Sequence, residues 1–509
     1  MAIQSDDAAA PGFILNLIEQ RAQYQRENIF LVAARTNQTV TFGELAMCAR
    51  HWGQRLSKLD LGPGARVGLL IADPLEFATT FVGLLANGIW VAPLDPALVD
   101  LQGHALDQRL SNLRLRAVVS DRERPHDAHW NWIGLDDPLV DEALSAGPRD
   151  FATNEGGVVL ASSGTTGPPK VILLPTRQLL HASHLIARHN ELDATSIGFN
   201  SLPLWHINAE VVAVLASLVA GSTIALDDRF HRTDFWVTIK RMGVTWINAV
   251  PAIIAHLSTL RDGETVPEQV RFIRSASAPL PATVLARFQA TTGLTVIETY
   301  GMTEAASQIC ANPLAGPHKL GSVGRPVGVE LRIRQTDSGA KAGIGEVEIR
   351  GPSVIERYES RELDVRFDEG GWLRTGDMGY LDDDGYLFLA GRRDDMINRG
   401  GEKIFPREIE DVVLGVPGVA NAAVIARDDE VFGQVPVLYL QLHVSDVELE
   451  ESAVVLGAVR EAVSANFDRT RRPVEVVVVE RMPTHATGKI QKKVLGGGSV
   501  SELSREAFA

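Results

Sequence analysis

The sequence is poor in cysteine: Cys48 and Cys310 are the only two in 509 residues. Two thiols cannot build a disulfide framework or a zinc site with four thiolate ligands, so neither is expected. Basic residues are also in the minority, and the formal net charge is −15 at pH 7. Because nucleic-acid phosphates select clustered lysine and arginine, we expect no nucleic-acid partner.

Long hydrophobic runs are missing as well. The first residues, MAIQSDDAAAPG, contain no basic segment followed by an apolar one, so we expect no signal peptide. The most apolar stretch, VVAVLASLVAGSTIAL at 211–226, is shorter than a membrane span and contains serine and glycine. We interpret it as a buried helix that runs into a strand. The composition therefore indicates a soluble, cytoplasmic protein without a membrane span.

Short runs rich in valine, isoleucine and leucine alternate with helical patterns up to about residue 300. Four such runs lie at 65–73, 90–95, 115–121 and 156–163. This alternation predicts an α/β fold, with a large N-terminal domain of mostly parallel sheets covered by helices. The length of the chain exceeds what one hydrophobic core supports, so further domains are expected.

From about residue 320 the sequence consists of short strands separated by glycine and aspartate. We expect a β-rich subdomain at about 320–393, in which DDDG at 382–385 forms a hairpin turn. We place a domain boundary at Asp394, so that 1–393 is the N-terminal domain and 394–509 is a small, mobile α+β domain.

The C-terminal domain opens on a helix that we expect to begin at Pro406, because proline suits the first helical position. Its last residues, GGGSVSELSREAFA, have no clear helix or strand pattern, and we expect them to be loose.

The segment ASSGTTGPPK at 161–170 follows an apolar run and is typical of a phosphate-binding loop. Its glycines let the backbone approach an anion, while its hydroxyl groups and Lys170 add donors. It is not the nucleotide loop G-x-x-x-x-G-K-[ST], because Pro169 stands where the second glycine should be. Taken alone, the segment is also compatible with a flexible surface loop.

Four further segments combine glycine with acidic, aromatic or basic residues. They are TYGMTEAAS (299–307), GWLRTGDMGY (371–380), GRRDDMINRGGEKIFPREIE (391–410) and PTHATGKIQKK (483–493). Each alone is explained by a turn, a hairpin, a helix start or a basic tail. Together with the loop at 161–170, and in this order, they resemble the acyl-adenylate-forming enzymes. That family includes acyl-CoA synthetases, firefly luciferases and the adenylation domains of peptide synthetases, and the resemblance spans about residues 28–494.

The resemblance implies an ATP-dependent acid–CoA ligase with two half-reactions. A small carboxylic acid and ATP give acyl-AMP and pyrophosphate, and coenzyme A then gives acyl-CoA and AMP. The first step brings one anion onto another, so the site must neutralise charge and hold the reactants in line. ATP, Mg²⁺ and coenzyme A are the implied cofactor and cosubstrates.

The resemblance also assigns the nucleotide site. Thr165, Thr166 and Lys170 should hold the β- and γ-phosphates, and Glu304 should bind Mg²⁺ with Thr166 nearby. Lys489 should reach both the attacking carboxylate and the α-phosphate. The other residues expected to line ATP or AMP are Ser162, Ser163, Gly164, Gly167, Ala278, Pro279, Tyr300, Gly301, Met302, Thr303, Asp377 and Arg392.

Within that set, Tyr300 is expected on one face of the adenine, and Ala278 with Pro279 on the other. Thr303 should contact the α-phosphate, while Asp377 and Arg392 should hydrogen-bond the ribose. Glu304 could instead cap a helix, and Asp377 could merely fix a turn.

The second half-reaction is expected to need a rotation of the C-terminal domain. Asp394 matches the hinge position of the family, and Gly400 and Gly401 match a loop that lines the pantetheine tunnel. Glycine suits a tunnel wall because it allows close approach. The same glycines could simply cap the preceding strand.

The acid itself stays open. The segment PLWHINAEVV at 203–212 should end near the acyl group, and it lacks the aspartate with which amino-acid-activating members hold an ammonium group. Residues 299–330 look closest to oxalate- and short-acid-CoA ligases. Within FIRSASAPL (272–280), Arg274 or Ser275 could bind a second carboxylate, as could His206.

The segment at 203–210 conflicts with the likeness of residues 299–330 to oxalate-type ligases. PLWHINAE departs from the His-x-His-Gly form that we associate with oxalate-type ligases, and looks more like carnitine-type or secondary-metabolite acid ligases. His206 is therefore equally compatible with an aromatic gate, and Asn208 completes the expected acyl pocket.

Three alternatives remain at this point. A luciferase-like oxygenase would share every nucleotide motif. A stand-alone ligase would load an acyl carrier protein instead of coenzyme A. A non-catalytic nucleotide-binding relative is also conceivable, although the presence of both Lys489 and Glu304 weighs against it.

Overall fold

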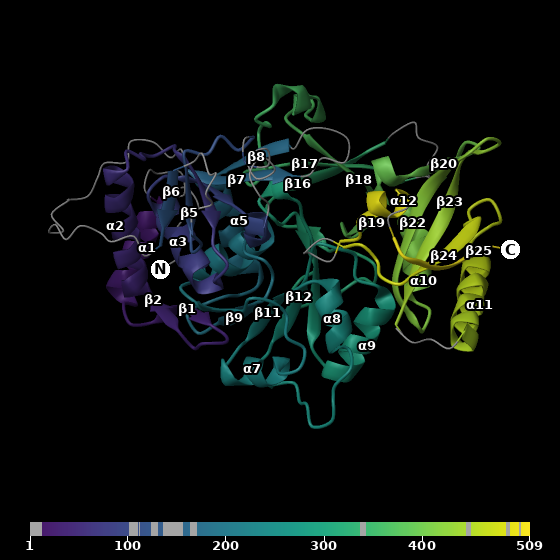
Figure 1. The fold of residues 1–509 in the computed structure, drawn as a ribbon, viewed down its shortest axis with the longest axis horizontal. Coiled ribbons are helices and arrows are strands. Elements are labelled where there is room, and N and C mark those ends of the chain that lie inside the picture. The colour runs from purple at the N-terminus through teal and green to yellow at the C-terminus, as the bar shows by residue number, and fades with distance from the viewer. Residues whose placement is uncertain are drawn as a thin grey trace.

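The computed structural model describes residues 13–100, 110, 112–123, 131–135, 156–162, 170–335, 343–443, 449–484, 489–497 and 500–508. In Figure 1 the chain passes from helices and sheets at the left, through the centre, to a separate sheet at the right that holds the C-terminus. No helix within these ranges is long and apolar enough to cross a bilayer.

A mostly parallel sheet forms early in the chain. Its strands in the described ranges are β3 (Arg66–Leu70), β4 (Trp90–Pro93), β5 (Ala117–Ser120), β6 (Asn131–Gly134), β7 (Gly157–Ser162) and β8 (Lys170–Pro175). They lie in the order β6-β5-β3-β4-β7-β8, and only the β7–β8 pair is antiparallel. The four strand predictions in this region are confirmed.

A second, larger sheet follows the order β15-β14-β13-β12-β11-β9-β10-β1-β2. Its strands are β1 (Ile29–Ala33), β2 (Thr39–Thr41), β9 (Ile197–Asn200), β10 (Thr223–Leu226), β11 (Trp246–Ala249), β12 (Phe272–Ser275), β13 (Thr295–Tyr300), β14 (Cys310–Ala311) and β15 (Arg325–Pro326). The run from β13 to β1 is parallel. Parallel strands all end at one edge, and ligands of such sheets bind there.

Helices cover both sheets. They are α1 (Phe13–Tyr24), α2 (Phe42–Lys58), α3 (Pro74–Ala86), α5 (Thr176–His189), α6 (Ala216–Ala220), α7 (Phe235–Arg241), α8 (Pro251–Leu257) and α9 (Ala282–Thr292), with short 3-10 turns η2 (Pro96–Asp100) and η4 (Thr303–Ala305). Local chemistry fixes several starts. Thr41 and Glu44 form a reciprocal capping box on α2, and Asp73 caps α3, which opens on Pro74.

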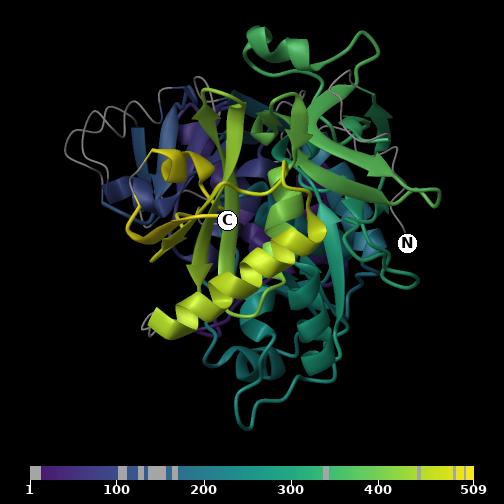
Figure 2. The same cartoon turned by 90° about the vertical axis from the view of Figure 1, so that its right-hand side faces the viewer.

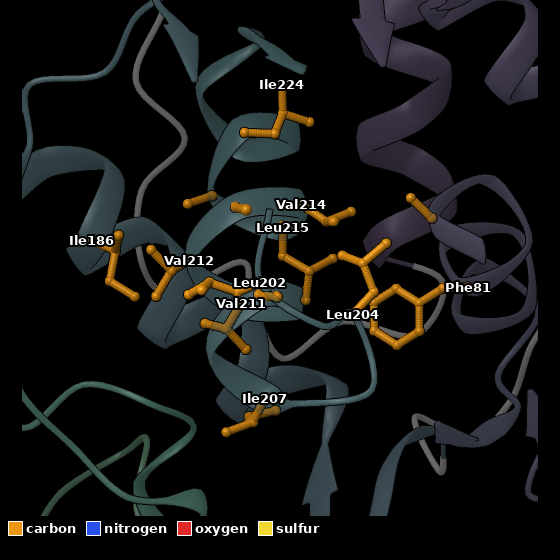
Figure 3. Close-up of a cluster of buried hydrophobic side chains, with 14 of the residues drawn as sticks. Phe81, Ile186, Leu202, Leu204, Ile207, Val211, Val212, Val214, Leu215 and Ile224 are labelled. Atoms are coloured by element: carbon orange, nitrogen blue, oxygen red, sulfur yellow. The ribbon is translucent and has the colours of Figure 1, made fainter. Parts of the chain in front are cut away.

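The apolar stretch at 211–226 is buried, as expected, but its first part is a π-helix, η3 (Ala209–Leu215), which continues as α6 and leads to β10. Figure 3 shows Val211, Val212, Val214 and Leu215 of η3 packed among Ile186, Phe81 and other buried side chains. π-Helical turns are uncommon and occur frequently at functional sites. Here the packed helix holds the preceding segment, 203–208, in place.

The β-rich region contains β16 (Glu330–Arg334), β17 (Gly345–Arg350), β18 (Leu373–Leu381) and β19 (Leu387–Arg392), antiparallel throughout, with the 3-10 turn η5 (Arg361–Arg366). The hairpin predicted at 382–385 is confirmed between β18 and β19. Gly385 there has a φ of +78°, which glycine adopts readily.

The last sheet has its own hydrophobic core. Its elements are η6 (Arg393–Asp395), β20 (Ile397–Arg399), β21 (Glu402–Ile404), α10 (Pro406–Leu414), β22 (Val419–Asp429), β23 (Gly433–Leu442), α11 (Leu449–Asn466), β24 (Glu475–Val479), α12 (Lys492–Gly496) and β25 (Glu502–Ala507). Figure 2 shows α11 lying across one face of this sheet. The helix start predicted at Pro406 is confirmed.

The expectation of a loose C-terminal tail is wrong. Residues 502–507 form β25, which pairs antiparallel with β24 at the edge of the sheet. Most of β25 is exposed, so its sequence carries little hydrophobic pattern. This strand forms because its backbone is hydrogen-bonded to β24. Burial of its own side chains contributes little. The α/β class with a terminal α+β sheet is confirmed.

Candidate active site

The carboxyl end of β13 begins a tight reversal that carries several predicted site residues. A side chain at Gly301 would place its Cβ 1.4 Å from the carbonyl oxygen of Ser307, so only glycine fits. Ala306 and Ser307 have φ values of +49° and +90°, which non-glycine residues rarely adopt. Such strain clusters at functional sites. The reversal therefore sets Met302, Thr303 and Glu304 in one fixed geometry.

Tyr300, Asp377 and Arg392 come together, although they are far apart in the sequence. The Tyr300 hydroxyl donates to Asp377 Oδ2 at 2.5 Å, and Arg392 Nη1 lies 3.2 Å from Asp377 Oδ1. Strands β18 and β19 place Asp377 directly opposite Arg392. Burial, followed by the charge of Asp377, raises the pKa of Tyr300, so its hydroxyl stays protonated and donates. The predicted adenine and ribose residues thus form one cluster.

Glu304 is buried and is held by two residues that the sequence did not single out. The Tyr358 hydroxyl donates to Glu304 Oε1 at 2.9 Å, and Arg366 Nη1 donates to that hydroxyl at 3.0 Å. The guanidinium of Arg366 also lies 3.6 Å from Glu304 Oε1 and donates to the carbonyls of Arg374 and Thr375. These carbonyls precede Asp377 on β18. Arg366 therefore connects the acidic group expected to bind metal with the strand expected to bind ribose.

Lys170, at the start of β8, belongs to the same cluster. Burial and the nearby Arg366 lower the pKa of its ammonium group, while Glu304 and Asp394 raise it. A lysine beside two arginines indicates a concentration of positive charge, which suits phosphate groups. Between β7 and β8, residues 163–169 lie outside the described part of the chain. The predictions for Ser163, Gly164, Thr165, Thr166 and Gly167 fall there, and for Ser162 only the backbone is described.

The loop that follows β12 contains Ala278 and Pro279, the expected second wall of the adenine site. Ser277, just before them, has a φ of +71°, and Pro279 is exposed. The structure thus leaves Pro279 exposed and Ala278 partly exposed, which is compatible with the predicted adenine wall.

The expected acyl residues lie on the neighbouring strands. Arg274 on β12 is opposite Asn248 on β11, and Asn248 Nδ2 donates to Asn208 Oδ1 at 2.8 Å. Arg274 Nη2 donates to Gln308 Oε1 at 2.6 Å. Arg274 and Asn208 thus belong to one polar group of side chains, whereas Ser275, the next residue on β12, alternates to the other face.

His206 lies on the loop before η3, half-buried, with its ring 6.2 Å from that of Trp205. This position is compatible with either an aromatic gate or an acid anchor. Asn248 and Gln308 are additional polar residues of the acyl side that the sequence did not indicate. Strand register alone could have suggested Asn248.

The predicted hinge, tunnel and catalytic residues of the C-terminal region are more exposed than the nucleotide cluster. Asp394 is exposed on η6, and Gly400 and Gly401, with φ values of +59° and +97°, form the turn between β20 and β21. Gly400 N donates to the Phe432 carbonyl at 2.8 Å. Lys489 is exposed, and within the described part of the chain no hydrogen bond or ion pair joins it to the nucleotide cluster. The structure does not bring Lys489 or the two glycines together with that cluster.

One hydrogen bond joins α10 to the larger sheet region, and charged groups of α10 lie near Glu298 of that sheet. Thr283 Oγ1 donates to the Leu414 carbonyl at 3.4 Å. Glu298 on β13 is buried and its pKa is raised to about 7 by burial, although Arg407 of α10 lowers it and Asp411 raises it. An acidic residue of the main sheet therefore faces charged groups of the C-terminal region.

Family models match most of the chain. The model described as "AMP-binding enzyme" matches residues 18–359, and the model described as "AMP-binding enzyme C-terminal domain" matches residues 408–489. Both matches agree with the family resemblance inferred from the five motifs.

Curated relatives align over nearly their whole length. The sulfoacetate–CoA ligase of Cupriavidus necator is 34% identical over 94% of this chain and 96% of its own. The oxalate–CoA ligase of Arabidopsis thaliana is 33% identical over 86% of this chain and 89% of its own. These relatives confirm the predicted acid–thiol ligase activity over its alternatives.

Solved structures of a CoA synthetase are similar to this chain over nearly its whole length. The o-succinylbenzoate CoA synthetase of Bacillus subtilis in complex with its acyl-adenylate has a TM-score of 0.83 and 28% identity, covering 97% of this chain and 99% of its own. The same enzyme with ATP and a magnesium ion has a TM-score of 0.81 and 28% identity, covering 94% and 99%. The predicted cosubstrates, ATP with magnesium and coenzyme A, are confirmed by these relatives. The chain belongs to the AMP-binding enzyme family.

Proposed function

We propose that this chain activates a small carboxylic acid as its adenylate and then transfers the acyl group to coenzyme A. It is an AMP-forming acid–CoA ligase. The observation that carries the assignment of its residues is the cluster of Tyr300, Asp377, Arg392, Glu304 and Lys170, which lies where the carboxyl end of β13 meets β18, β19 and the start of β8. The cluster combines an aromatic ring, ribose-binding groups, a carboxylate and cations, which together suit a nucleoside phosphate.

The nucleotide is held by groups that are already oriented. Asp377 accepts from Tyr300 and Arg392, so its oxygens have fixed directions toward a ribose. Thr303 contacts the α-phosphate, and Lys170 binds the β- and γ-phosphates together with Thr165 and Thr166. Preorganised donors of this kind stabilise developing charge without reorganising during the reaction.

Glu304 suits a magnesium ion that arrives with ATP. Tyr358 engages Oε1, and Oε2 takes part in no hydrogen bond among the described residues, so it is available to a cation. A hard carboxylate oxygen is the ligand that Mg²⁺ prefers. An ion held there by Glu304 would neutralise phosphate charge. Thr166 is the second residue that we place near it.

Lys489 is the catalytic residue of the first half-reaction, where its ammonium group draws the carboxylate and the α-phosphate together. Its exposed position supports a group that enters and leaves the site. Asp394 is the pivot, and we place the boundary between residues 1–393 and 394–509 there. The β-rich region at about 320–393 ends directly before it.

In the second half-reaction Gly400 and Gly401 line the path of the thiol. Their hairpin turn has no side chain, which supports close approach by a pantetheine arm. The relatives named above are CoA ligases, and this favours coenzyme A over a carrier protein as acceptor. His206, Asn208 and Arg274 surround the acyl group, with Ala278 and Pro279 beside the adenine, while Ser275 points to the other face of β12 and is not part of the proposed acyl pocket. A cytoplasmic location completes the proposal.

The test is pyrophosphate release from MgATP with acids of four classes: short acids with two acidic groups, aryl acids, fatty acids and terpenoid acids. Each active acid is then offered coenzyme A or a phosphopantetheinylated carrier protein. Acid-dependent pyrophosphate and a CoA thioester are expected. Pyrophosphate with no acid of any class, or release of ADP instead of AMP, would contradict the proposed reaction.

A further inference from the structure

The guanidinium group of Arg274 is fully enclosed, with only 1% of the residue exposed. It lies on β12, flanked by β11 and β13 in the middle of the larger sheet. A buried cation is costly unless a negative group or several acceptors compensate it. The partners of Arg274 therefore need to be accounted for.

Those partners are too few. Arg274 Nη2 donates to Gln308 Oε1 at 2.6 Å, while its buried Nε and Nη1 have no partner among the described residues. No carboxylate in the described part of the chain forms an ion pair with it. Burial lowers the pKa of Arg274 to about 9, so the group still carries its charge at pH 7. A protonated guanidinium with free donors needs an anion.

Neighbouring polar groups also lack hydrogen-bond partners. Gln308 Nε2, a donor, and Asn248 Oδ1, an acceptor, are buried without hydrogen-bond partners among the described residues. Burial lowers the pKa of His189, a hydrogen bond with the Asn312 carbonyl raises it, and the charge of Arg274 lowers it; the net shift is downward, so the ring stays neutral and does not compensate Arg274. The free donors of Arg274 and Gln308 together favour an anion at this place.

This polar group adjoins the segments proposed to bind the nucleotide and the acyl group. Gln308 follows the reversal that presents Thr303 and Glu304, and Asn248 links Arg274's strand to Asn208 in the loop before η3. The anion site is therefore continuous with both the adenylation residues and the acyl segment.

We propose that Arg274 binds a second anionic group of the acid substrate, either a carboxylate or a sulfonate, carried on the same small molecule as the carboxylate that becomes adenylated. This inference rests on the proposed function and specifies its substrate class. Gln308 orients the guanidinium through Nη2, which leaves Nε and Nη1 as free donors on the two sides of the group, and the anion accepts from at least one of them. A neutral acid leaves the buried charge uncompensated and is rejected.

The experiment compares acids that differ only by a methyl group in place of the second anionic oxygen. The pairs are oxalate with pyruvate, malonate with acetoacetate, succinate with levulinate, and sulfoacetate with methylsulfonylacetate. The wild-type enzyme should use the best charged acid with a kcat/KM about 10²–10⁴-fold above that of its neutral partner. The sulfonate pair separates a sulfonate preference from a carboxylate preference.

The Arg274→Met variant removes the charge and keeps much of the length. Its ratio between the two members of the best pair should fall to near one, while its KM for MgATP stays within a few-fold of wild type. The matched control is Arg271→Met, an exposed arginine stacked on Phe272 near the start of the same strand, which should keep the full ratio. Calorimetric binding of AMP verifies that each variant is folded.

If Arg274→Met does not fold, the inference is tested by the ratios of kcat/KM for charged over neutral acids in the wild type and in Arg274→Lys. The lysine variant keeps the charge and should keep the preference, with a higher KM for the charged acid. Equal use of charged and neutral partners by the wild type, or an unchanged ratio in Arg274→Met, overturns the inference. Activity with fatty or aryl acids and none with the four charged acids overturns it too, but leaves the ligase reaction standing.

Discussion

The two halves of the candidate site differ in how completely their polar groups are paired. On the nucleotide side, Asp377 accepts from Tyr300 and Arg392, and Glu304 accepts from Tyr358. On the acyl side, Arg274 has two buried nitrogens without a partner among the described residues. The first half has its geometry before any ligand binds, whereas the second half is completed by the ligand.

This difference corresponds to what each half must recognise. ATP is the same for every member of such a family, so a fixed set of donors can be oriented once by the fold. The acid varies between relatives, which include ligases of sulfoacetate and of oxalate. A buried charge that only the correct acid can pair provides selectivity, because every other acid leaves it unpaired.

The largest effect is expected from replacing Lys489. This replacement tests whether the paired residues of the nucleotide side can form the adenylate without Lys489. Lys489→Ala should lower acid-dependent pyrophosphate release about 10²–10³-fold, because one stabilising donor in the transition state is lost. Formation of acyl-CoA from supplied acyl-AMP should stay near wild type. Lys493→Ala, an exposed lysine close by, is the control. An equal loss in both half-reactions would refute the role given to Lys489.

Replacing the proposed hinge residue tests whether the two half-reactions need two different positions of the C-terminal domain. Asp394→Pro fixes φ near −65° and should restrict the rotation. Single-turnover pyrophosphate release should remain, while acyl-CoA formation from acyl-AMP should fall by about tenfold or more. Asp394→Ala should be milder in both assays. A proline variant that makes acyl-CoA at the wild-type rate would place the pivot elsewhere.

Glu298 tests the contact between the main sheet and α10. Burial raises its pKa to about 7 from an ordinary value near 4.5, so the native state holds a proton that the unfolded state releases. The stabilising contribution is complete below pH 4.5 and is lost as the pH rises toward 7. Between pH 5 and pH 8, Glu298→Gln should therefore gain about 1–3 kcal/mol of unfolding free energy relative to wild type. Parallel pH profiles in urea unfolding would show that Glu298 is not buried in this way.

The smallest effect is expected at Tyr358, whose hydroxyl fixes Glu304. Tyr358→Phe keeps the ring and removes one hydrogen bond to a carboxylate, so the Mg²⁺ concentration for half-maximal ATP binding should rise about 5–10-fold. The direct readout is calorimetric binding of ATP at several Mg²⁺ concentrations. Tyr386→Phe removes a comparable hydroxyl that donates to the Pro317 carbonyl and should leave binding unchanged. Similar shifts in both variants would indicate general loosening.

The parallel sheets, the hairpin at 382–385 and the helix start at Pro406 could be predicted, because hydrophobic runs, turn residues and caps act locally. Tyr358 and Arg366 could not, because they contact Glu304 only through the fold and carry no motif. The strand β25 was missed for the opposite reason: it is exposed, and only pairing with β24 defines it. Arg274 was suggested by resemblance, but its unpaired nitrogens became evident only when its neighbours were known.

The central claim is that a second anion completes the acyl side, and binding of a stable acyl-adenylate analogue tests it most directly. Two sulfamate analogues are titrated calorimetrically into the wild type and Arg274→Met: one carries the second anionic group of the best acid, the other its methyl isostere. The account predicts a preference of about 100-fold for the charged analogue in the wild type, and none in Arg274→Met, which still binds both through the adenosine. Equal affinities in the wild type, or the same preference in both proteins, would contradict it.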